Sequence, residues 1–212
     1  MGIGPDHRGT IDDTPLFARR FIEGRLAGFA KDMEVCLKPL KIPGRRTPTH
    51  AYFPALGTCC GTLEYLAALH YGNVNSIGWD VLANWTARYL PQPDYDNAVT
   101  RILVLAFRNS VNHRGIASGV YVDPRPGPGH GWRYTWKVHA DAIRPACEIR
   151  EELGTLIKDS PWPCSYTHRV HIHLKGLQVD IRNGARKFVE DIGAKPQLQR
   201  NFEACMNQLY PE

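Results

Sequence analysis

Apolar residues recur along the first half of the chain at the three- and four-residue intervals of amphipathic helices. Thr14 followed by Pro15 suits a helix start, because threonine caps helices and proline is tolerated in the first turn. The pattern predicts helices from Thr14 until Pro39 and over 53–70, 77–90 and 94–107. Residues 102–107 are apolar on all sides, which is typical of a helix at the centre of a bundle.

The pattern changes after residue 113. A turn rich in proline and glycine at 123–129 separates two segments, 115–122 and 132–138, that favour strands and together predict a β-hairpin with a long loop. A short helix is then expected over 146–157, and residues 169–174 alternate like a strand. Two further helices fit residues 177–192 and 197–209.

These elements predict a mainly α protein, an antiparallel helical bundle with a small C-terminal α/β region that contains a short β-hairpin. Residues 1–13 are expected to be flexible, 14–120 to form the bundle, and 121–212 to form a mixed α/β extension packed on it. No linker-like composition separates the two parts, so we expect one compact unit.

Composition and cysteine pattern indicate which cellular compartment and which partners to expect. The chain has 212 residues, a formal net charge of +5 and six cysteines, none in a C-x-x-C pair. Cys59 and Cys60 lie in an apolar stretch and should pack as small hydrophobic residues. The polar first 20 residues do not resemble a signal peptide, and no apolar run reaches the ~20 residues of a membrane span. We therefore expect a cytoplasmic protein with reduced thiols and no membrane partner; the mild basicity permits a nucleic acid.

The most specific chemical pattern is Arg108, Asn109 and His113, which follow directly on the apolar helix. Such residues suit metal-independent RNA cleavage: a histidine can act as base or acid, an arginine fork can stabilise phosphate oxygens, and asparagine can orient either. The alternative is structural, with Arg108 paired to a carboxylate and His113 at a helix C-terminus, where the helix dipole favours its charged form.

The arrangement Arg-Asn-x-x-x-His at the end of an apolar helix in a helical bundle resembles the HEPN superfamily. The resemblance covers about residues 15–120, and its specific part is Arg108, Asn109 and His113. It implies a metal-independent endoribonuclease (a hydrolase) or an RNA-binding relative, with RNA as partner and a homodimer whose two motifs face a shared groove. A toxin of this kind would also have a cognate antitoxin. The alternative is a non-catalytic helical scaffold or interaction protein.

A second histidine cluster lies at His168, His171 and His173. On a strand, His171 and His173 point the same way and can chelate a metal, whereas His168 points to the opposite face. No Glu or Cys in the local sequence completes a ligand set, so an ordinary half-exposed strand is favoured and no metal or other cofactor is predicted. The aromatic residues Trp132, Tyr134 and Trp136 share one strand face, which can stack bases but more often packs on helices.

Overall fold

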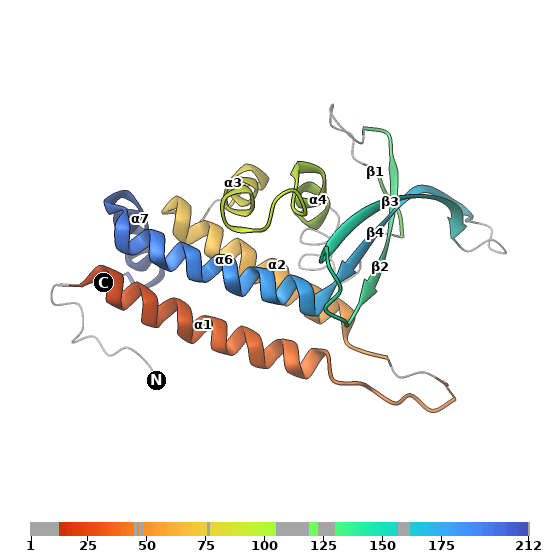
Figure 1. The fold of residues 1–212 in the computed structure, drawn as a ribbon, viewed down its shortest axis with the longest axis horizontal. Coiled ribbons are helices and arrows are strands. Elements are labelled where there is room, and N and C mark those ends of the chain that lie inside the picture. Colours follow the sequence, from red (N-terminus) through yellow and green to blue (C-terminus); the bar gives the residue numbers. More distant parts are fainter. Residues whose placement is uncertain are drawn as a thin grey trace.

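Three long helices run side by side and set the length of the molecule (Figure 1). They are α1 (Thr14–Cys36), α2 (Tyr52–Tyr71) and α6 (Leu174–Ala194). The shorter helices α3 (Trp79–Tyr89), α4 (Asn97–Ile102) and α7 (Pro196–Leu209) pack around them. The computed structural model describes residues 13–44, 46, 49–75, 77–104, 119–122, 130–156 and 162–211.

Local sequence explains where these helices begin and end. Asp13 caps α1 by accepting a hydrogen bond from the Leu16 amide, so the helix starts one residue earlier than a Thr14 cap would place it. Asp96 caps α4 in the same way. Gly72 ends α2 with a left-handed backbone (φ 88°). Glycine is typical of this position because it adopts that conformation without steric cost.

The apolar faces of the helices meet in one core that also receives the inner face of the sheet. Helix α2 packs against α1, α3, α6 and α7, and its buried residues include Cys59 and Cys60, which pack as small hydrophobic residues as predicted. The large aromatic side chains that are fully buried in the described core are Trp85, Tyr95, Phe188 and Phe202. Among the described helices, none combines the length and apolar composition that a membrane span needs.

A four-stranded mixed sheet lies at one end of the long helices (Figure 1). Its order is β1 (Tyr121–Val122), β2 (Arg133–His139), β4 (Cys164–His173), β3 (Cys147–Leu156). β1 pairs with β2 antiparallel, which confirms the predicted hairpin pairing. β2 and β4 run parallel, and β3 pairs antiparallel with β4 at the other edge.

The predicted fold class is wrong in its architecture. The expected short helix over 146–157 is strand β3, and α6 and α7 follow the sheet and return to pack on α1 and α2. The C-terminal part is therefore no small appendage, because its helices form part of the bundle core. Glutamate and leucine give β3 a helical texture, but its pairing along β4 overrides that local preference.

A buried polar contact ties the start of α4 to the rest of the fold. Asp180 of α6 is buried and accepts a hydrogen bond from the Tyr95 hydroxyl at 2.8 Å. The guanidinium of Arg144, in the connection between β2 and β3, pairs with the other oxygen of the same carboxylate. Three segments distant in sequence thus meet at one charged side chain.

Candidate functional site: histidines and a carboxylate at the edge of the sheet

Arg108, Asn109 and His113 lie outside the described residues. What the structure describes is their approach: α4 ends at Ile102, and Ile102, Leu103 and Val104 are all buried in the core. The burial expected of this apolar stretch is confirmed for Ile102, Leu103 and Val104, while the helix itself packs mainly on α3 and β3 rather than at the centre of the helices.

Histidines gather instead on one face of the sheet. The parallel register of β2 and β4 pairs Lys137 with His171 and His139 with His173, so these four side chains project from the same face. The opposite face carries Tyr134, Val170 and Ile172, which belong to the core. Register therefore sends the apolar residues toward the core and places Lys137, His139, His171 and His173 on the other side.

At the C-terminal ends of the parallel strands, His139, Asp141 and His173 converge. One ligand atom from each lies within 4.8 Å of the others, the one such group of three in the described part of the chain. The His173 Nδ1 contacts Asp141 Oδ1 directly, and the rings of His139 and His173 stack with centroids 4.6 Å apart. In open α/β sheets, ligands commonly bind at this edge, just beyond the strands.

Two backbone hydrogen bonds hold this corner in place. The amide of His173, the residue that precedes α6, donates to the Ala146 carbonyl at 2.8 Å. The amide of Lys175, in the first turn of α6, donates to the carbonyl of Asp141 at 3.0 Å. Asp141 and His173 are thereby fixed by the main chain as well as by their side chains.

The surroundings favour the neutral form of the His139 and His171 imidazoles at this edge. Burial is the main cause that lowers the pKa of His139, and the adjoining His173 adds to it. Burial likewise lowers the pKa of His171, with Arg150 contributing. For Asp141, partial burial acts to raise the pKa, but the hydrogen bond to His173 and the charge of that ring outweigh it and hold the pKa below its ordinary value.

The aromatic residues Trp132, Tyr134 and Trp136, which share one strand face, pack against other residues of the protein. Tyr134 is buried in the core, and Trp136 packs against the core. Trp132, 40% exposed, stacks on His168 with ring centroids 3.8 Å apart. His168 lies on the opposite face from His171 and His173, as predicted from strand alternation.

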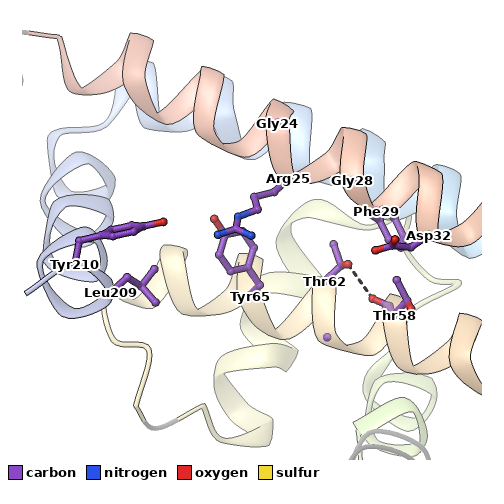
Figure 2. A pocket seen from close by; sticks show the side chains of 11 residues that line it. Gly24, Arg25, Gly28, Phe29, Asp32, Thr58, Thr62, Tyr65, Leu209 and Tyr210 are labelled. Atoms are coloured by element: carbon purple, nitrogen blue, oxygen red, sulfur yellow. Dashed lines mark hydrogen bonds between the residues drawn. The ribbon is translucent and has the colours of Figure 1, made fainter. Parts of the chain in front are cut away.

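A groove of about 680 Å³ runs between α1 and α2 (Figure 2). Small residues open it: a Cβ added to Gly24, Gly28 or Gly61 would meet nothing within 4 Å. Its two charged side chains, Arg25 and Asp32, are seven residues apart on one helix, roughly 10 Å along the axis. The groove places Arg25 beside Tyr65, with the guanidinium 6.0 Å from the ring centroid, but among the described residues only the sheet edge gathers three metal-ligating side chains.

No protein-family model, curated protein or solved structure matches this chain. The resemblance to HEPN proteins accordingly stays a prediction carried by Arg108, Asn109 and His113.

Sequence reasoning singled out His171 and His173 but missed His139 and Asp141. The signal was present: His139-x-Asp141 follows one alternating segment, and His171-x-His173 ends another. Only parallel neighbouring strands would bring these pairs together. Because residues 146–157 were expected to be helical, the sheet that makes β2 and β4 neighbours was not apparent.

Proposed function

We propose that this protein is a metal-independent endoribonuclease, and that Arg108, Asn109 and His113 carry the reaction. The observation behind the proposal is the motif itself, which follows the apolar stretch 102–107 in the sequence; the described residues of that stretch, Ile102, Leu103 and Val104, are buried. A segment anchored in the core is a suitable base for catalytic side chains, because acid–base and phosphate contacts need positions held to within about 0.5 Å.

The chemistry follows from the three side chains. His113 takes the proton of a ribose 2′-hydroxyl, whose oxygen then forms a bond to the adjacent phosphorus. The bond from phosphorus to the 5′-oxygen breaks, and that oxygen takes up a proton, which leaves a 2′,3′-cyclic phosphate and a 5′-hydroxyl. Arg108 holds the phosphate oxygens with two parallel hydrogen bonds while charge builds on them, and Asn109 orients the reacting groups. The net charge of +5 favours an anionic substrate.

The test is cleavage of labelled single-stranded and hairpin RNAs in excess EDTA. We expect the wild type to cut RNA, to leave the matching 2′-deoxy strands whole, and to produce cyclic phosphate ends. His113→Ala and Arg108→Lys should each slow cleavage about 10²–10⁴-fold, since lysine keeps the charge but lacks the guanidinium fork.

Exposed residues of the same types serve as controls. His130→Ala and Arg186→Lys change surface side chains outside the motif and should cut at the wild-type rate. An intact RNA panel, or a His113→Ala variant that cuts as fast as the wild type, would refute the proposal. An Arg108→Ala variant that unfolds well below the wild type would favour the structural alternative, in which a partner carboxylate is left unpaired.

We further propose that the chain works as a homodimer and, if it is a toxin, with a cognate antitoxin. In the sequence, the apolar second and fourth helices offer surface for a two-fold contact, but the buried residues of α2 and α4 are already covered within one chain. A dimer contact would therefore use other surfaces than the buried side of α2.

A further inference from the structure

We propose that His139, Asp141 and His173 form a binding site for a first-row divalent transition metal ion such as Zn²⁺. Two imidazole nitrogens and one carboxylate oxygen are donors that zinc, cobalt, nickel and ferrous ions accept. The three residues come from two strand ends that the parallel pairing of β2 and β4 brings together. The site lies outside the motif at 108–113, and this inference does not rest on the proposed ribonuclease function.

The geometry is close to what one ion requires. With metal–ligand bonds of about 2.0–2.2 Å, two donors on the same ion lie at most about 4.4 Å apart. The three ligand atoms are already within 4.8 Å of one another, so small side-chain rotations bring them into range. His173 Nδ1 and Asp141 Oδ1 are in direct contact, and an ion would replace that hydrogen bond once the two atoms move apart to the roughly 3.4 Å of tetrahedral donors. Three protein donors leave at least one position for water.

The surrounding residues resemble the outer layer of a metal site. Metal-binding histidines are usually oriented by a hydrogen bond at the other ring nitrogen. Here His139 Nε2 lies 3.2 Å from His171 Nδ1, a contact that can hold the ring of His139 while its other nitrogen faces an ion.

The charge balance also permits a cation. Arg150 pairs with Glu148 at 2.6 Å, and Arg169 pairs with Glu152 at 2.9 Å, so each nearby guanidinium has a carboxylate of its own. Asp141 then contributes a negative charge at the site, and its side chain is 45% exposed while that of His173 is 7% exposed. An ion therefore has a route from solvent and a buried ligand to hold it.

The competing interpretation is a histidine–aspartate pair that shares a proton and binds no metal. The two differ in what Asp141→Asn does. An asparagine keeps the shape and can still hydrogen-bond to His173, but it loses the anionic oxygen that an ion needs. This change is made at a half-exposed side chain, so the fold should survive it.

The experiment is a calorimetric titration of Zn²⁺ into the full chain, free of any histidine tag and stripped with a chelator. We expect one ion per chain. Asp141→Asn and His139→Gln should each weaken binding at least 100-fold, because loss of an outer partner alone typically costs about 10–100-fold. His171→Ala should fall in that smaller range. Co²⁺ added in place of zinc should give a visible absorption band that Asp141→Asn removes.

The matched control is His168→Gln, which changes a histidine on the same strand but on the opposite face. It should bind Zn²⁺ as the wild type does, and circular dichroism should show all variants folded. No heat and no cobalt band would overturn the proposal, as would equal affinity in Asp141→Asn or an equal loss in His168→Gln. None of these measurements involves RNA, so their outcome is independent of the ribonuclease test. If cleavage stops in EDTA and in Asp141→Asn, it is the metal-independent mechanism that fails.

Discussion

The contact between Tyr95 and Asp180 should be one of the costliest polar interactions to remove. Tyr95 is 1% exposed and Asp180 is 2% exposed, so neither group can turn to water when its partner is lost. Replacing Asp180 with alanine strands the tyrosine hydroxyl, at a cost of about 1–3 kcal/mol. The lost pair with Arg144 adds at most about 1 kcal/mol, because that guanidinium is 44% exposed and can be hydrated. We expect Asp180→Ala to lower the free energy of unfolding by about 1–4 kcal/mol.

A double-mutant cycle separates the pair from the effect of each side chain. Tyr95→Phe alone removes a hydrogen bond to a charged group, worth about 1.5–3 kcal/mol. Combined with Asp180→Ala it removes both partners, so no hydroxyl is left stranded and the total should fall short of the sum by at least about 0.5–1 kcal/mol. Urea unfolding followed by circular dichroism gives each free energy.

The control is Glu190→Ala, an exposed carboxylate on the same helix, which should change stability by no more than about 0.5 kcal/mol. Strict additivity in the cycle, or an Asp180→Ala variant as stable as the wild type, would refute the reasoning. A large effect would show that the start of α4, and so the approach to residues 108–113, is held by α6.

Two further predictions concern stability. In α6, Gly184→Ala should destabilise the protein by up to about 2 kcal/mol, because the new Cβ would lie 3.0–3.1 Å from the Tyr89 carbonyl, Leu90 and Trp85, and this crowding outweighs the gain of about 1 kcal/mol in helix propensity. Gly193→Ala in the same helix meets nothing within 4 Å and should stabilise it by up to about 1 kcal/mol; melting temperatures that move the same way in both variants would contradict this. Burial, aided by Arg88, lowers the pKa of His70, whose ring packs edge-on against Tyr89 and Phe188. Because the pKa of His70 is lower in the folded chain, the unfolded chain binds a proton there at a higher pH than the folded chain does. The stability from neutral His70 is therefore present above pH ~6.5 and is lost as the pH falls through the lower pKa of the folded chain. Melting curves between pH 7.5 and 5 should fall less steeply for His70→Gln than for the wild type, and equal slopes would contradict the assignment.

Hydrophobic periodicity predicted most of the helices from the sequence. A helix buries the side chains of one face, and these recur at intervals of three and four residues. Residues 52–71 and 196–209 are examples, and the caps at Asp96 and Gly72 act through neighbours a few residues away. The hairpin of β1 and β2 could also be predicted from the sequence, because its two strands are close together along the chain. Local chemistry also marked His171 and His173 as a pair on one strand face.

Only the tertiary structure decided the rest. Whether residues 147–156 form a helix or a strand depended on the ladder offered by β4, which no local preference records. The separate parallel pairing of β2 along the other side of β4 brought His139 and Asp141 to His173. The same holds for the return of α6 and α7 to the bundle, because their apolar faces show that they pack but not against which partner. Structure formed by residues close in sequence could be predicted from the sequence. Contacts between distant segments could not, because they depend on how all the apolar faces of the chain are buried together.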